Sequence, residues 1–110
     1  MNHVGIDIIE NERVRRVLSD PLMRKILSKE EYEKCQDYPE EKKVRFVAGR
    51  FACKEAIIKC LSDFELPELS DLNIVNNEKG KPEIRYKDYK ISVSISHEKN
   101  YSTAIAVMEE

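Results

Sequence analysis

Apolar residues recur at helical spacing through the middle of the chain, on two sides of one predicted helix. Pro39 precedes this segment and the next proline is Pro67, so the pattern predicts a long helix that includes residues 45–61. One apolar face comprises Phe46, Gly49, Cys53, Ala56, Ile57 and Cys60, and the other comprises Ala48, Phe51, Ala52 and Ile58. A helix that is apolar on two sides packs between layers, so we expect it at the centre of the fold.

Two charged residues, Glu55 and Lys59, interrupt the second apolar face of this helix. Because they are four residues apart, one explanation is an exposed ion pair worth about 0.2–0.5 kcal/mol. The other is a functional site, because a charge on a crowded apolar surface must be paired or bound to a metal. Gly49 costs the helix about 1 kcal/mol relative to alanine, and it indicates close approach of another backbone.

Alternating residues near the N-terminus predict a strand over residues 3–9, with Val4, Ile6 and Ile8 on one side. Asp7 lies on the other side, and aspartate is uncommon in strands. It either accepts a hydrogen bond from a nearby backbone donor or holds a carboxylate at the edge of a site. The local pattern leaves both readings open.

Short helices are predicted between this strand and the long helix. Asn11 is expected to cap the first of them, and Ser28 forms a capping box with Glu31 at another. Basic residues concentrate in this segment, namely Arg13, Arg16, Arg24 and Lys25. Such charges usually form a solvated helix face, but a partner that binds them should be acidic.

The C-terminal third has the pattern of antiparallel strands. Residues 72–75 and 83–86 flank a turn-rich segment and predict one hairpin. Residues 90–96 and 101–108 alternate strictly and predict a second hairpin. One N-terminal strand, a long helix and C-terminal hairpins together predict an α+β fold, as a single domain over residues 1–110.

Composition narrows the functional classes. The chain has 110 residues, of which 36% are charged and 7% aromatic, so its core is modest and subunit association is expected. A net charge of −2 gives no reason to expect nucleic-acid binding. The three cysteines lack C-x-x-C spacing, which predicts small core residues in a reducing compartment. Without a signal-like segment or a long apolar span, we expect a cytoplasmic protein and no membrane partner.

Common catalytic motifs are missing from the sequence, including phosphate-binding glycine loops, zinc-ligand spacings and a nucleophile elbow. Candidate chemistry therefore rests on Asp7, Glu55 and Lys59. Two carboxylates and a lysine suit Mg²⁺ and a polyphosphate, because magnesium takes one or two protein carboxylates and completes its octahedron with water and phosphate oxygens.

Three stretches together resemble the holo-[acyl-carrier-protein] synthases, which are 4′-phosphopantetheinyl transferases. Residues 5–14 resemble the opening motif of that family. Residues 45–59 are similar to its signature helix, R-F-x-[AS]-x-R-[FW]-[AS]-x-K-E-A-x-x-K. Residues 93–97 and the strand 101–107 resemble its C-terminal hairpin. The resemblance covers nearly the whole chain.

The resemblance implies that phosphopantetheine moves from coenzyme A to a serine of apo acyl carrier protein, in fatty acid biosynthesis, in a homotrimer with active sites between subunits. Asp7 and Glu55 match the carboxylates that hold Mg²⁺, and Glu55, directly or through a water, is the candidate to take the serine proton. Lys59 matches the lysine that stabilises charge on the pyrophosphate. Further coenzyme A contacts are implied for Arg50, Lys42, Gly80, Lys81, Pro82, Ser96 and His97. Carrier-protein docking is implied for Arg13, Arg16, Arg24 and Lys25.

The chain departs from the family pattern at two places. After Lys59 the family has a glycine-rich turn, A-x-G-T-G, whereas this chain continues through residues 60–65 without glycine. The opening motif has Gly5 alone where many members have G-x-G. Two other functions therefore stay open. One is a catalytically silent module that docks an acidic partner, and the other is an enzyme that acts on a different nucleotide or carrier.

Overall fold

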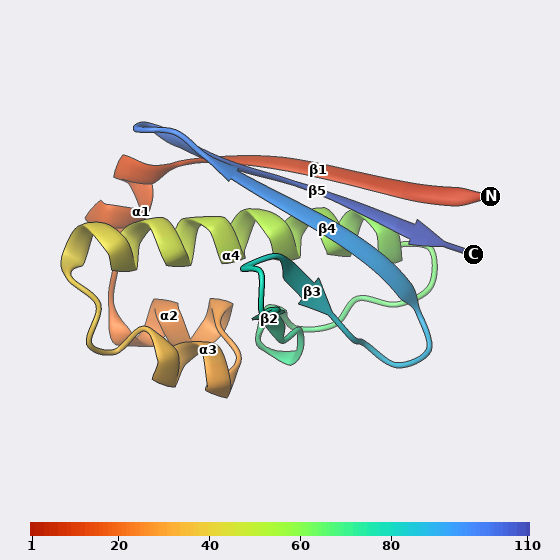
Figure 1. Cartoon of the computed structure of the whole chain (residues 1–110), viewed down its shortest axis with the longest axis horizontal. Helices are drawn as coiled ribbons and strands as arrows, with labels where there is room; N and C mark the ends of the chain where they lie inside the picture. The colour runs from red at the N-terminus through yellow and green to blue at the C-terminus, as the bar shows by residue number, and fades with distance from the viewer.

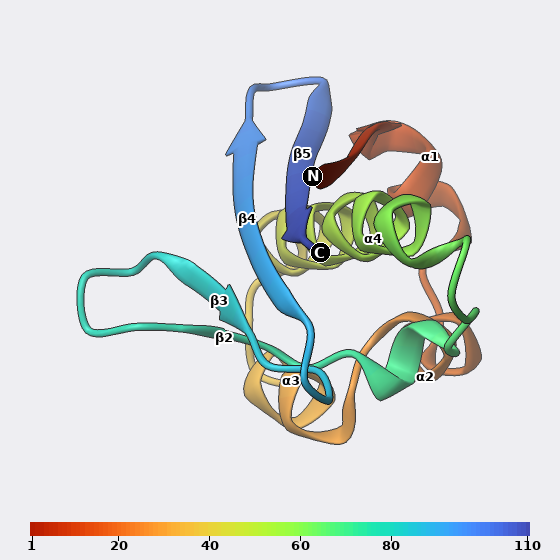
Figure 2. The same ribbon diagram turned by 90° about the vertical axis from the view of Figure 1, so that its right-hand side faces the viewer.

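A three-stranded antiparallel sheet lies across one long helix, as the views in Figures 1 and 2 show. The computed structural model describes all 110 residues. The strand order is β1-β5-β4, so the N-terminal strand pairs with the C-terminal strand. The bounds are Asn2–Glu10 for β1, Lys90–His97 for β4, Tyr101–Glu109 for β5 and Glu40–Leu61 for the helix, α4.

The opposite side of α4 is covered by α2 (Asp20–Ile26), α3 (Lys29–Lys34) and the 3₁₀ turn η1 (Leu69–Asp71), which form the lower layer in Figure 1. The helix α1 (Asn11–Val17) follows β1 directly and lies above this layer, beside the start of α4. A small hairpin of β2 (Ile74–Asn76) and β3 (Pro82–Ile84) projects away from this layer (Figure 2). The α+β architecture and both hairpins are therefore confirmed, although the first hairpin is shorter than the sequence predicted.

Most apolar residues of α4 are buried, but they divide between two cores along the helix rather than by the two predicted faces. On the sheet side, Cys53, Ala56, Ile57 and Cys60 pack in one core with residues of β4 and β5. On the other side, residues near the start of α4 pack in a second core with α1 and α2. All three cysteines are free and buried, and none of the helices is long and apolar enough to cross a membrane.

Two glycines mark close contacts with α4. A Cβ atom on Gly5 would lie 1.9 Å from the carbonyl oxygen of Ala56, so only glycine allows β1 to approach the helix backbone here. A Cβ atom on Gly49 would lie 2.6 Å from Cε1 of His97. The expectation of a backbone neighbour at Gly49 was therefore wrong: an imidazole ring occupies that space, and the backbone contact occurs at Gly5 instead.

The outer face of the sheet is not covered by any other part of the chain. Val4, Ile6 and Ile8 of β1 are 60%, 61% and 62% exposed, and Tyr101 and Ile105 of β5 lie exposed beside them. The alternation of β1 thus directs Gly5, Asp7 and Ile9 toward α4 and leaves an apolar stripe facing outward.

One capping prediction is confirmed and one is wrong. Ser28 and Glu31 form the capping box of α3. Asn11 does not cap α1, because Glu10 holds the N-cap position and the Asn11 side chain turns to the β4–β5 connection. There its amide donates to the carbonyl oxygens of Glu98 and Lys99.

Candidate active site

The fold brings the three principal candidates, Asp7, Glu55 and Lys59, to one place. Asp7 lies on the helix-facing side of β1, and Lys59 Nζ is 3.8 Å from its Oδ1 and 2.6 Å from the carbonyl oxygen of Ile6. Asp7 and Glu55 line a common cavity of about 450 Å³ between β1, α1, α2 and α4. Lys59 is one helical turn beyond Glu55, which explains the four-residue spacing in the sequence.

The electrostatics of this cavity favour a bound cation. Asp7 Oδ2 is buried and has no hydrogen-bond partner, which is unusual for a carboxylate oxygen in a folded protein. Burial, and then the neighbouring Asp7 charge, raise the pKa of Glu55, while Lys59 opposes this shift. The two carboxylates therefore repel one another, and a positive charge between them would satisfy both.

The donor set distinguishes between metals. The chain has no group of three or more histidine, cysteine, aspartate or glutamate side chains placed to hold a metal ion together. The residues supply two carboxylates and a neighbouring lysine. This set fits Mg²⁺, which keeps waters and phosphate oxygens in its coordination shell.

Of the four predicted docking residues, Arg13, on α1, lines the same cavity and makes no ion pair. Arg16 lies 3.9 Å from a Glu10 oxygen. Arg24 packs over the Tyr32 ring with Asp20 3.6 Å away, on the wall of a separate cavity. All four are exposed, on α1 and α2: Arg13, Arg16, Arg24 and Lys25.

The structure places His97 away from the carboxylates. It ends β4, at the sheet edge opposite β1, and its ring lies over Gly49 of α4. Burial and then the charges of Arg45 and Arg50 lower the pKa of His97. Ser96 is on the outer face of β4, because neighbouring strand residues point to opposite sides.

Arg50 belongs to a buried ionic cluster rather than to an open surface. The cluster comprises Glu31, Arg50 and Lys54, which are 2%, 6% and 0% exposed. Arg50 donates to the Ile74 carbonyl oxygen and to Asn76 Oδ1, at the base of the β2–β3 hairpin. Burial lowers the pKa of Arg50, and the Glu31 carboxylate partly offsets this effect. Its predicted contact with coenzyme A stays a prediction.

The other predicted coenzyme contacts lie apart from both places. Lys42 is exposed in the first turn of α4, with Nζ 4.2 Å from the centre of the Tyr38 ring. Gly80 and Lys81 are exposed at the tip of the β2–β3 hairpin, and Pro82 begins β3. Gly80 has φ 84°, a conformation that favours glycine. In a single chain, these candidates do not converge on Asp7 and Glu55.

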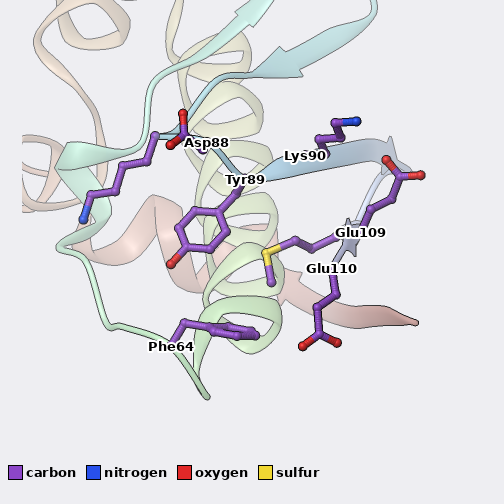
Figure 3. Close-up of a pocket in the computed structure, with 8 residues that line it drawn as sticks. Phe64, Asp88, Tyr89, Lys90, Glu109 and Glu110 are labelled. Carbon is purple, nitrogen blue, oxygen red and sulfur yellow. The ribbon is translucent and has the colours of Figure 1, made fainter.

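The segment that replaces the family's glycine-rich turn is held by Glu65. Its carboxylate accepts hydrogen bonds from Tyr86, Lys87 and Tyr89, which lower its pKa to about 2. Next to it, Phe64 forms part of the wall of a second cavity, of about 640 Å³. Figure 3 shows Phe64 and Tyr89 on one side of this hollow and Glu109 and Glu110 on the other. None of the predicted site residues lines it, so we place the candidate active site at the smaller cavity.

The sequence did not predict several residues that contact or influence the candidate site residues in the structure. Lys54 lies among buried apolar positions of the signature helix, and that signal was available. Arg45, which begins the signature, is exposed and acts on His97. The Ser102–Asn11 hydrogen bond joins residues 91 positions apart, so no local pattern could have shown it. Ser102 and His97 are only five positions apart, across the β4–β5 hairpin.

Comparison with known protein families agrees with this geometry. Residues 3–106 match a family model described as the 4′-phosphopantetheinyl transferase superfamily. The chain is 39% identical over 112 residues to the holo-[acyl-carrier-protein] synthase of Staphylococcus carnosus, which covers 97% of this chain and 96% of that protein.

Solved structures give the same result. A holo-(acyl-carrier-protein) synthase of Bacillus anthracis, in complex with CoA (3′,5′-ADP), superposes with a TM-score of 0.87 at 32% identity, covering 96% of this chain and 94% of that one. A Helicobacter pylori holo-[acyl-carrier-protein] synthase in complex with coenzyme A gives a TM-score of 0.78 at 28% identity, covering 96% and 99%.

Proposed function

The chain belongs to the holo-[acyl-carrier-protein] synthases of the 4′-phosphopantetheinyl transferase superfamily, and from this premise we propose how its residues perform the reaction. The enzyme transfers 4′-phosphopantetheine from coenzyme A to a serine of apo acyl carrier protein, in fatty acid biosynthesis. Adenosine 3′,5′-bisphosphate is the second product. The observation that carries the residue assignment is the buried, unpartnered oxygen of Asp7 beside Glu55.

Asp7 and Glu55 are the residues that would hold Mg²⁺. When bound there, the ion would supply positive charge to balance the charge that develops on the phosphate oxygens, which is the main electrostatic requirement of phosphoryl transfer. Lys59, which holds the Ile6 carbonyl in the free protein, stabilises the pyrophosphate from the adjacent helical turn.

Glu55 takes the proton from the carrier serine, directly or through a water. The serine oxygen then bonds to the phosphorus that carries pantetheine. The bond from this phosphorus to the bridging oxygen breaks, and adenosine 3′,5′-bisphosphate leaves with the bonding electrons. The raised pKa of Glu55 suits this role, because it makes the carboxylate a better proton acceptor at neutral pH.

The assembly is a homotrimer with an active site between each pair of neighbouring subunits. Two observations support it: the outer face of the sheet exposes an apolar stripe, and the coenzyme candidates on β4 and the β2–β3 hairpin lie away from the carboxylates. In this assembly His97, Lys81 and Lys42 of one subunit contact the coenzyme bound at Asp7 and Glu55 of its neighbour.

The oligomer is tested by Ile6→Glu, which places a charge in the apolar stripe. We expect a monomer by sedimentation, with loss of transfer activity, because the site is incomplete without its neighbour. Leu66→Glu is the matched control, since Leu66 is 73% exposed and lies outside the sheet. A trimer that persists in Ile6→Glu would contradict this interface.

Carrier protein docks on the basic surface formed by Arg13, Arg16, Arg24 and Lys25. The position of Arg13 on the wall of the cavity and the exposure of all four residues support this docking, because an acidic helix bound there would bring its adjoining serine toward Glu55.

The reaction is tested by mixing the protein with apo acyl carrier protein, coenzyme A and Mg²⁺, and weighing the carrier by intact mass spectrometry. We expect a gain of one phosphopantetheine that disappears on chelation and returns with added Mg²⁺. Carrier binding without a gain in mass, while a known transferase works in parallel, would support the catalytically silent module instead.

A further inference from the structure

A chain of hydrogen bonds connects α1 to the imidazole ring of His97 through two buried side chains. Asn11 is 6% exposed and Ser102 is 0% exposed, yet both are polar. The Ser102 hydroxyl lies 2.7 Å from Asn11 Oδ1 and 2.8 Å from His97 Nδ1. The role assigned above to His97 does not account for these two residues.

The direction of each hydrogen bond follows from the backbone. Asn11 Nδ2 lies 3.2 Å and 3.3 Å from the carbonyl oxygens of Glu98 and Lys99, which can only accept. The amide nitrogen must therefore face these carbonyls, and Oδ1 must face Ser102. Since Oδ1 carries no proton, the Ser102 hydroxyl donates to it.

The Ser102 hydroxyl has one proton, and this bond uses it. Its oxygen can then only accept from His97, so the Nδ1 atom of His97 must carry a proton. In the neutral ring Nε2 consequently has a free lone pair. The Cε1–Nε2 edge of the ring lies over Gly49, on the face of α4 that presents Arg45 one turn earlier.

A phosphate oxygen accepts hydrogen bonds, and an unprotonated Nε2 can also only accept. Nε2 must therefore gain a proton before it can donate a hydrogen bond to a phosphate oxygen. The charged groups that act on the ring are Arg45 and Arg50, both on α4, while β5 and α1 offer it only the Ser102 hydroxyl and, behind it, the Asn11 amide. These arginines attract a phosphate and keep the free ring neutral, because they disfavour a further positive charge.

We propose that Asn11 and Ser102 are positioning residues that fix the Nδ1–H tautomer of His97, so that the ring takes up one proton at Nε2 when a phosphate of coenzyme A binds. The second half of this inference rests on the proposed contact between His97 and coenzyme A. The first half concerns the free protein and can be tested without any ligand.

The tautomer is measured by two-bond proton–nitrogen correlation NMR on the ¹⁵N-labelled protein. The chain has two histidines, so His3→Gln leaves His97 as the only signal. At a pH where the ring is neutral, we expect Nε2 at the shift of an unprotonated nitrogen and Nδ1 at that of a protonated one. The reverse assignment in this otherwise unchanged protein would overturn the inference, whether or not further variants fold.

Ser102→Ala tests which residue fixes the tautomer. We expect the variant to show a mixture of tautomers, because Nδ1 loses its only acceptor. Ser94→Ala is the matched control, since Ser94 is an exposed serine on the other face of the sheet. An unchanged tautomer in a folded Ser102→Ala protein would remove Ser102 from the role.

Proton uptake is measured by titration calorimetry with coenzyme A in two buffers of different ionisation enthalpy. At a pH above the pKa of the free ring, we expect each site to take up close to one proton when coenzyme A binds. The affinity for coenzyme A should then fall as the pH rises, by at most about tenfold per pH unit. His97→Gln should remove the uptake. Binding without uptake would refute the proton linkage alone, whereas no binding at all would count against the proposed function and leave the NMR result standing.

Discussion

Two charged clusters begin one residue apart on α4 and differ in whether their charges are satisfied. In the cluster around Lys54, Glu31 accepts from Lys54 and from the backbone N–H groups of Ser28 and Ile74. In the cluster around Glu55, the buried oxygen of Asp7 has no partner. The first cluster joins α2, α3, α4 and β2 and gives both Lys54 and Glu31 hydrogen-bond partners, although Arg50 Nε, 3.5 Å from Glu31 Oε2, has none. The second cluster is open toward a cavity.

This difference separates structural from functional charges better than burial does. Lys54 is the more deeply buried residue, but its amine is bonded to Glu31 and to the Ile26 carbonyl oxygen. Glu55 is less buried, yet its pKa is raised because its near neighbours include another carboxylate. A buried charge with a full set of partners stabilises the fold, and a charge with an incomplete set indicates a ligand.

The largest expected effect is on the cluster around Lys54. Lys54→Met removes one partner of a buried pair and leaves the Glu31 charge uncompensated, so we expect a loss of about 3–5 kcal/mol in the free energy of unfolding. Urea unfolding measures it. Lys43→Met changes a more exposed lysine of the same helix and should cost far less. A Lys54→Met protein as stable as the parent would show that this cluster is not structural.

The open cluster should respond in the opposite manner. Glu55→Gln keeps the shape of the side chain but cannot take a proton, so we expect transfer to slow on the order of 10²–10⁴-fold. Stability should stay equal or rise, because repulsion with Asp7 is removed. Initial rates by mass spectrometry and urea unfolding test both statements. Retention of most of the activity would show that Glu55 is neither the base nor a required metal ligand.

A smaller effect is expected from two arginines of α1 that differ in the same way. Arg15 is paired with Glu12 and Glu41, whereas Arg13 makes no ion pair and lines the cavity. Arg13→Glu should weaken carrier binding by about 1 kcal/mol, roughly fivefold in the KM for carrier protein, with the KM for coenzyme A unchanged. Arg15→Glu carries the same change of charge, and an equal effect there would mean that docking depends only on net charge.

The smallest expected effect is in the pH dependence of stability. The pKa of Glu55 is raised in the folded protein, so the ionised Glu55 destabilises the fold at neutral pH. As the pH falls through the raised pKa, Glu55 is protonated and this destabilisation disappears. The stability advantage of Glu55→Gln over the parent should therefore be present at pH 7 and shrink toward pH 4.5.

Glu65 provides the opposite case. Its pKa is lowered to about 2 from the ordinary value of 4.5. The ionised Glu65 therefore stabilises the fold at any pH above 4.5, and this contribution is lost as the pH falls toward 2. Glu65→Gln should be less stable than the parent at pH 7, with the difference vanishing in acid. Urea midpoints at a series of pH values measure the stability of Glu55→Gln and Glu65→Gln relative to the parent. If both variants were more stable than the parent at pH 7, or both less stable, the opposite roles of the two carboxylates would be contradicted.

The sequence was sufficient for the central helix and the strands, because both are encoded by local spacing. The apolar spacing of α4 and the alternation of β4 and β5 are periodic signals, and the structure follows them. The Asp7–Glu55 pair followed from the family resemblance, and the fold brings both residues to one cavity.

The errors and omissions came from long-range contacts. Asn11 has the composition of a helix cap, but two carbonyl oxygens of the β4–β5 connection compete for its amide. Gly49 looked like a site for a second backbone, and only the folded sheet brings His97 onto it. The apolar positions around Lys54 gave a local signal, but its partners, Glu31 and the Ile26 carbonyl oxygen, are more than 20 positions away and could not be inferred from it.

The pairing of β1 with β5 has a consequence for the order in which the protein is made. Asp7 is synthesised long before Tyr101–Glu109, the only strand that pairs with its own. Pairings over such sequence separations form slowly, because the loop must close before the contacts stabilise it. The carboxylate pair is therefore held in place only once β5 has been made, and a nascent chain that has already made α4 still lacks a rigid site.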